Sequence, residues 1–167
     1  MNIYVGKILL SAPSLADPNF DKVVILITEH NEKGALGFVM NKLFSRLFNE
    51  LVEFNNCKAF PLFDGGPVEK EKLFFLHRRS DLIEGGIRIA DNIYTGGNFN
   101  QAVQFINNNT INEDDIKLSI GYCGWDYGQL EEEIAEGSWI VSNTHSSIIF
   151  TTPIELLWNE IYMQENN

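Results

Sequence analysis

The sequence is poor in cysteine and has no long apolar run. Its 167 residues include only two cysteines, Cys57 and Cys123, whose separation fits neither a zinc site nor a disulfide framework. We therefore expect both thiols to be reduced, as in a cytoplasmic protein. The apolar start of the chain is interrupted by Lys7 and is too short for a signal sequence or a membrane span, so no membrane association is predicted.

Basic charge is also scarce. The chain has 12 Lys and Arg residues against 23 Asp and Glu residues, which gives a formal net charge of -11. Such a chain repels nucleic-acid phosphates, and it contains no basic helix or helix-turn-helix pattern. No direct nucleic-acid binding is therefore expected. The one basic cluster lies among acidic neighbours that nearly neutralise it: Lys70, Lys72, Arg78 and Arg79 with Glu69, Glu71 and Asp81.

The residues that could act in catalysis or bind a metal have no partner residue at the sequence spacing that such a site requires. His30, His77 and His145 have no second ligand nearby in the sequence, so neither a metal site nor a cofactor is predicted. Glu29 and His30 are adjacent, and adjacent residues on a strand point to opposite faces, which makes them a poor acid–base pair. The glycine turn at 65–67 is not followed by the lysine and serine of a phosphate loop. The sequence therefore favours a protein that is not an enzyme.

A large apolar fraction is what the sequence does have. At 167 residues, of which 44% are apolar, the chain suits a single domain over residues 1–167. A domain of this length buries about two thirds of its unfolded surface, so it needs no disulfide or metal for stability. No repeat, low-complexity segment or Pro- and Ser-rich linker divides it.

Alternating and β-branched segments predict a sheet. The unbroken apolar run within 22–28 indicates a central strand covered on both faces, and the polar residues 29–34 predict a hairpin to a second strand at 35–40. Further strands are expected at 3–11, 59–63, 73–77, 86–90, 116–120, 139–141 and 147–150. Helical spacing of apolar residues predicts four helices, at 44–54, from Asn98 to Ile106, from about Asp126 to Gly137, and from Thr152 to Ile161.

The segment 116–139 is the most distinctive. A one-sided strand at 116–120 leads into three glycines, which predict a tight turn before an acidic helix. Asp126 is placed to cap that helix, and Gln129 to reach back toward it. Cys123 is interpreted as a small buried residue rather than as a thiolate. Tyr122, Trp125, Tyr127 and Trp139 can seal the core or line a recognition groove; Trp139 is assigned to the core, and Trp125 and Tyr127 are left open.

A set of motifs in fixed order runs along nearly the whole chain: Gly6 with Leu9-Leu10 and Pro13, Phe20, Glu29-His30, Gly34-Ala35-Leu36-Gly37 with Asn41, Gly65-Gly66-Pro67-Val68, Leu76-His77, Gly121-Tyr122, Gly124-Trp125, Gly128-Gln129-Leu130-Glu131 with Glu133, and Trp139. In these motifs the chain resembles the YqgE/AlgH family of bacterial proteins. The resemblance implies an α+β fold: a mostly antiparallel coiled sheet that forms a partly closed barrel, flanked by about four helices. It also implies a cytoplasmic protein, in a family labelled as transcriptional regulators.

Two positions depart from the family's pattern. After Asn41 the family commonly has a basic residue and then proline, whereas here Lys42 is followed by Leu43, so the chain is expected to enter the first helix differently. Cys123 stands where a small apolar residue is usual, which argues against this thiol as a shared catalytic group.

Two main hypotheses about function follow. The first is a non-enzymatic regulatory or protein-interaction module with an unknown protein partner, using Trp125, Tyr127, Gln129 and the edge from Glu131 to Glu133. The alternative is an enzyme or small-ligand protein whose pocket gathers His30, Asn41, the Gly65-Gly66 turn and the loop from Gly121 to Gly128, because these polar and glycine positions lie at strand ends. A nucleic-acid accessory role is a weaker third. The candidate binding residues are His30, Asn41, Gly65, Gly66, Trp125, Tyr127, Gln129 and Glu131.

Overall fold

The computed structural model describes residues 3–14 and 21–166, in which nine strands form one sheet. The strands are β1 (Ile8–Ser11), β2 (Val24–Asn31), β3 (Gly34–Val39), β4 (Leu62–Asp64), β5 (Val68–His77), β6 (Ile87–Ala90), β7 (Ile93–Thr95), β8 (Ile116–Asp126) and β9 (Trp139–Ser142). Their order is β6-β7-β5-β8-β3-β2-β1-β9, with β4 paired to β8 beside this path. All pairs are antiparallel except β4 with β8. Within the described residues β6 and β9 do not pair, so the sheet is not closed.

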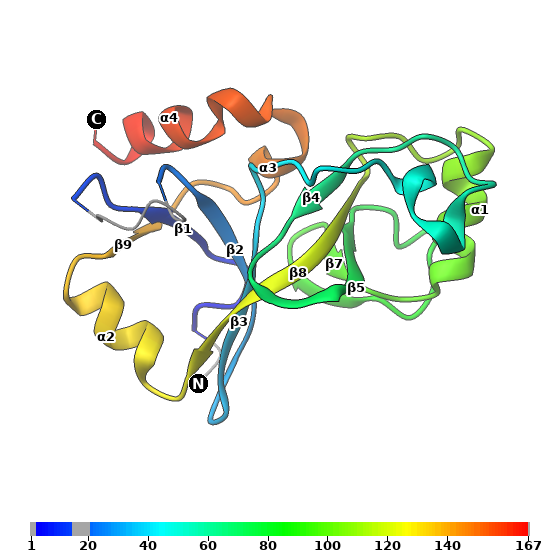
Figure 1. Cartoon of the computed structure of the whole chain (residues 1–167). Helices are drawn as coiled ribbons and strands as arrows, with labels where there is room; N and C mark the ends of the chain where they lie inside the picture. Colours follow the sequence, from blue (N-terminus) through cyan, green and yellow to red (C-terminus); the bar gives the residue numbers. More distant parts are fainter. Residues whose placement is uncertain (1–2, 15–20, 167) are drawn as a thin grey trace.

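Four α-helices flank the sheet, which confirms the predicted α+β class. They are α1 (Phe99–Asn107), α2 (Gln129–Ala135), α3 (Ile148–Thr151) and α4 (Ile154–Glu165). In Figure 1, α3 and α4 lie on one side of β1, β2 and β9, and α2 lies on the other. None of the helices in the two described ranges is long and apolar enough to cross a bilayer.

Strand β8 joins two halves of the molecule (Figure 1). Its first part, at 116–120, pairs with β5, and 118–120 also pair with β4 on the other edge. Its last four residues, at 123–126, pair with β3. The predicted turn at Gly121 is therefore wrong, because the strand continues to Asp126. The reason is tertiary: β3 of the β2–β3 hairpin pairs with β8 from Cys123 onward, after the pairing with β4 ends at Ile120 and that with β5 at Tyr122.

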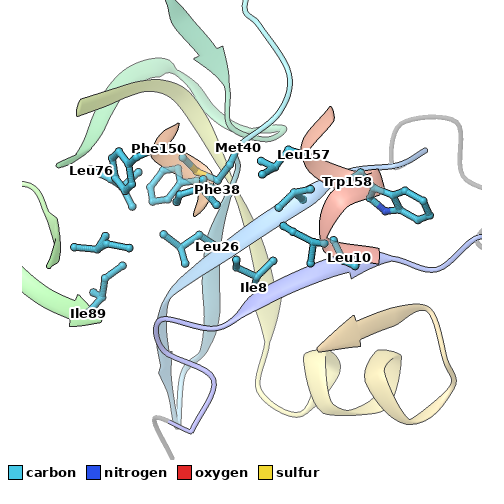
Figure 2. Close-up of a cluster of buried hydrophobic side chains, with 14 residues drawn as sticks. Ile8, Leu10, Leu26, Phe38, Met40, Leu76, Ile89, Phe150, Leu157 and Trp158 are labelled. Atoms are coloured by element: carbon cyan, nitrogen blue, oxygen red, sulfur yellow. The ribbon is translucent and has the colours of Figure 1, made fainter. Parts of the chain in front are cut away.

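The central strand β2 is buried on both faces, as predicted. Val24 and Leu26 pack into a core that α4 covers, where Leu157 and Trp158 meet the sheet (Figure 2). On the opposite face, Ile25 and Ile27 pack into a second core with Cys123, Trp125, Leu130 and Trp139, which α2 covers. The predicted hairpin is also present, since β2 and β3 are antiparallel neighbours.

The predicted helix at 44–54 is wrong. The segment contains two short 3₁₀ turns, Phe48–Glu50 and Val52–Phe54, rather than an α-helix. Its backbone donors are used by the chain leading into β4: Phe44 N donates to Leu62 O and Phe48 N to Phe60 O, both at 2.8 Å. The apolar side chains still reach a core, which they share with α1, β4, β5 and the first part of β8.

The predicted strand at 147–150 is also wrong, because this segment forms α3. Its backbone bonds are local, with Ile149 N donating to Ser146 O and Phe150 N to Ser147 O. Ile149 and Phe150 are buried against the core under α4. A single helical turn thus buries the same apolar pair that suggested a strand, and it leads directly into α4.

Candidate functional site

The carboxylate of Glu133 on α2 ties together three residues of the predicted site region. Its Oε1 accepts from the indole nitrogens of Trp125, at 3.0 Å, and Trp139, at 2.8 Å. Its Oε2 accepts from the amide of Gln129 at 3.0 Å. The two indoles meet edge to face with centroids 6.3 Å apart, and both are buried, at 8% and 5% exposure. Trp139 is in the core, as predicted, and Trp125 joins it there.

The role of Glu133 is one that the sequence did not reveal. Glu133 is one of the glutamates of the predicted acidic helix, and its carboxylate is held by three donors. The available signal was the spacing of four between Gln129 and Glu133, which places them on one face of a helix. Nothing local shows that Trp125 of β8 and Trp139 of β9, two strands that do not pair with each other, come to the same carboxylate.

The start of α2 differs in part from its prediction. Gln129 Oε1 does accept from Asp126 N, at 3.0 Å, as the reach-back arrangement requires. Asp126 itself is the last residue of β8, and the helix begins after Gly128, which has a left-handed φ of 84°. Tyr127 lies between them with 66% of its surface exposed. It is the exposed aromatic residue of this segment.

His30 lies near the end of the β2–β3 hairpin, against α2. Its Nε2 is 3.2 Å from Glu131 Oε2, and its ring meets Tyr4 edge to face at 5.1 Å. The ring is buried, and Nδ1 has no hydrogen-bond partner among the described residues. Glu29 is exposed on the opposite face of the strand, in line with the alternation that argued against a Glu29–His30 pair.

The Asn41 side chain forms hydrogen bonds with the backbone at the opposite end of the same hairpin. Its Oδ1 accepts from Val24 N at 2.9 Å, and its Nδ2 donates to Lys22 O at 2.8 Å. Val24 and His30 are six residues apart on β2, a separation of about 20 Å along a strand. The structure therefore does not bring His30 and Asn41 to one surface.

The Gly65–Gly66 turn is packed directly against β8. Gly65 N donates to Ile120 O, and Gly65 O accepts from Val39 N, both at 2.9 Å, so the turn joins β3 to β8. A Cβ on Gly65 would lie 1.9 Å from Ser119 Oγ, and a Cβ on Gly66 would lie 2.2 Å from the carbonyl carbon of Tyr122. These glycines are required by the close approach of two backbones.

The remaining candidate groups are engaged in packing. Burial raises the pKa of the Cys123 thiol to about 12, and its Sγ lies 3.6 Å from Gly65 O. His77 is fully buried between aromatic rings, with Nε2 3.0 Å from Gly96 O, and burial lowers its pKa. Across 3–14 and 21–166, no three His, Cys, Asp or Glu side chains are grouped so as to hold a metal ion.

Two depressions flank the last part of β8. The larger, about 440 Å³, is an open hollow at the end of the β2–β3 hairpin, and the smaller, about 150 Å³, is a slot between the β4–β5 connection and α2. The hollow is lined by Glu29, Asn31, Lys33, Gly34, Ala35, Leu36, Val68, Tyr122, Gly124, Trp125 and Asp126. The slot is lined by Pro67, Val68, Cys123, Gly124, Trp125, Gln129, Glu133 and Trp139. Both therefore reach Gly124.

The comparisons with known proteins agree with this architecture. The AlgH-like family (DUF179) matches residues 8–166. The chain belongs to the AlgH-like family. It is 38% identical to a UPF0301 protein of Chlorobium limicola over 162 residues, covering 92% of this chain and 82% of the relative. It is 36% identical to a UPF0301 protein of Cytophaga hutchinsonii over 157 residues, covering 93% and 86%. The resemblance noted from the motifs is confirmed.

Solved structures show the same fold. The solution structure of the AlgH protein from Pseudomonas aeruginosa superposes with a TM-score of 0.78 at 26% identity, covering 99% of this chain and 90% of that one. A crystal structure of a Corynebacterium diphtheriae protein has the same TM-score of 0.78 at 21% identity, covering 98% and 88%. The second likeness concerns the fold alone.

In this AlgH-like chain, the hollow, the slot and the exposed Tyr127 make up what we call the Gly124 surface, together with Gln129 and Glu131 on α2. Carboxylates predominate on it: Glu29 and Asp126 line the hollow, and Glu131 and Glu132 lie in the first turn of α2. Lys33 is the basic residue of the hollow. Of the predicted candidates, Trp125, Tyr127, Gln129 and Glu131 come together here, whereas Asn41 does not.

Proposed function

We propose that this chain is a non-enzymatic protein-interaction module that works in the cytoplasm by binding a partner protein through the Gly124 surface. The observation that carries the proposal is that Tyr127, 66% exposed, directly follows Asp126, which lines the open hollow. Tyrosine contributes a large, rigid contact area at protein interfaces and is enriched there. Beneath it, the Glu133 network fixes the backbone that presents the side chain.

The state of the candidate reactive groups supports binding over catalysis. Burial keeps the Cys123 thiol protonated at neutral pH, because its pKa is raised to about 12. His30 is buried against Glu131 rather than open to the hollow. If the chain regulates transcription, as the family's label suggests, we propose that it does so by protein contact, since a net charge of -11 opposes contact with DNA.

The test is site-specific photo-crosslinking in cells. A benzophenone amino acid in place of Tyr127 should give a discrete covalent adduct with another protein. The same amino acid in place of Ile87, which is 68% exposed on β6, serves as the matched control and should not. Equal adducts at both positions, or none at Tyr127, would contradict the proposal.

A second candidate is small-ligand binding in the hollow. Its volume of about 440 Å³ lies within the range of about 300–1,000 Å³ usual for ligand pockets. A thermal-shift screen of metabolites would favour this candidate if one compound raised the Tm of the chain and the double variant Glu29→Gln, Asp126→Asn lost that rise. A screen in which no compound distinguishes the two proteins would count against it.

A further inference from the structure

Strand β8 loses one of its two neighbours part-way along its length. Residues 118–120 are flanked on both edges, by β4 and by β5, and β5 still pairs with β8 at Val68 and Tyr122. Beyond that point, residues 123–126 pair only with β3 in the described part of the chain. Pro67, just before β5, has no N–H to donate to a strand. One edge of β8 is therefore left without a strand partner around Gly124, which is exposed.

Gly124 is unlike the glycines packed around it. Added Cβ atoms on Gly65, Gly66 and Gly121 would each meet another atom within 2.5 Å. A Cβ on Gly124 would meet nothing closer than a ring carbon of Tyr122 at 3.6 Å, and its φ is not positive. The fold therefore does not require glycine at this position, although glycine inside a strand costs about 0.5–1 kcal/mol relative to alanine. A glycine of this kind marks a place where another backbone or ligand approaches closely.

The two depressions lie on opposite faces of the strand at this point. Tyr122 and Asp126 line the hollow alone and Cys123 lines the slot alone, whereas Gly124 and Trp125 border both. Tyr122 packs against one core and Cys123 against the other, as expected for alternate residues of a strand. A strand laid along the free edge would point its side chains alternately into the two depressions. The hollow offers the carboxylates of Glu29 and Asp126, and the slot is walled by Pro67, Val68 and two indoles.

We propose that the edge of β8 at Gly124 binds an extended basic segment of a partner protein, which adds to the sheet as a further strand. This proposal rests on the proposed function and names the kind of partner that the Gly124 surface takes. The segment places a lysine or arginine in the hollow and a small apolar side chain in the slot. Glu29 pairs with Leu36 of β3, which pairs with Gly124, so Glu29 lies two strands, about 10 Å, from β8. A basic side chain directed at Glu29 must therefore pass over the bare backbone of Gly124 and then over the half-buried Leu36.

The test uses labelled hexapeptides in which Lys or Arg alternates with Ala, Val or Leu, titrated against the full chain by fluorescence anisotropy. At least one should bind saturably, and Gly124→Leu should weaken that binding by about tenfold or more, because its side chain blocks the path across the strand. Urea unfolding should show that Gly124→Leu remains folded. N-methylation of alternate peptide nitrogens should abolish binding, since strand addition depends on main-chain donors.

Charge is tested by a matched pair of variants. Glu29→Gln with Asp126→Asn should weaken binding, while Glu155→Gln with Glu160→Gln on α4, which changes the net charge equally, should not. No binding by any hexapeptide, or equal binding by Gly124→Leu or by the N-methylated peptide, would overturn strand addition. If one of these negative peptide results were found together with a Tyr127 cross-link in cells, partner binding at the Gly124 surface would stand and strand addition would be rejected. If the Tyr127 cross-link were absent, the proposed function itself would be rejected.

Discussion

Glycine has different roles in the Gly65–Gly66 turn, which packs against β8, and at Gly124, which lies within β8. At Gly66 the backbone is positive in φ, at 150°, and an added Cβ would lie 2.2 Å from Tyr122, so packing leaves no room. At Gly124 the φ is ordinary and the space is open. The comparison shows that one glycine-rich signature combines positions that the fold needs with a position that it does not. Cys123, which lies between the two regions, and the glycines themselves can be altered separately to break that distinction.

The largest expected effect is on the reactivity of the Cys123 thiol, because this side chain is buried between Gly65 and Gly124. Burial raises the pKa of its thiol from 9.0 to about 12, so at pH 8 the thiol is almost fully protonated. In the single-thiol variant Cys57→Ser, reaction with Ellman's reagent at pH 8 should be at least about tenfold slower than that of free cysteine, because the thiol is both protonated and buried. Labelling at the rate of free cysteine would mean that the Gly65 turn does not cover this thiol.

The same pKa shift has a consequence for stability. The folded pKa is above the unfolded value, so only the unfolded chain ionises this thiol between pH 9.0 and about 12. The stability that the neutral thiol contributes is complete below pH 9.0 and is lost as pH rises through this window. Cys123→Ala should therefore lose less stability than the natural chain over that range.

Gly66→Ala should be the most destabilising glycine substitution of the comparison. The new methyl group meets the Tyr122 backbone and also sits at an unfavourable φ, which together should lower the free energy of unfolding by about 3 kcal/mol. Urea titration followed by circular dichroism measures the change. A loss below about 1 kcal/mol would show that the turn yields easily, and the contrast with Gly124 would disappear.

Glu133→Ala should have an intermediate effect. It leaves the buried indole N–H groups of Trp125 and Trp139 without their acceptor, which should cost about 2 kcal/mol. Glu133→Gln keeps an accepting oxygen and should cost less. Tryptophan fluorescence during urea unfolding reports both. Equal stability of Glu133→Ala and the natural chain would show that the network does not support the Gly124 surface.

Gly124→Ala should have the smallest effect, and of the opposite sign. Alanine fits the site and restricts the unfolded chain, so stability should be unchanged or rise by up to about 1 kcal/mol. Gly128→Ala is the matched control, because it also has open space but a φ of 84°, and it should lose about 1 kcal/mol. If Gly124→Ala lost as much as Gly128→Ala, the strand would need glycine there for folding.

Local sequence patterns predicted the elements whose bonding is local or whose burial is unambiguous. The apolar run of β2 and the start of α1, where Asn98 accepts from Gln101 N, are present as predicted. The segment at 44–54 has helical spacing but no helix, because Phe44 and Phe48 donate to the chain near β4 instead. Spacing reports which side chains are buried, but it does not report where the backbone donors go.

For the candidate site, the sequence by itself determined the family, the acidic balance and the reach-back from Gln129 to Asp126, because these depend on composition and on residues close along the chain. Only the tertiary structure decided that Trp125 is buried against Glu133, that Asn41 lies apart from His30, and that Gly124 is open while Gly66 is not. The physical reason is that a glycine's space is set by the atoms of other strands. Glycines that look alike in the sequence therefore differ in whether the fold leaves room for a side chain at their position.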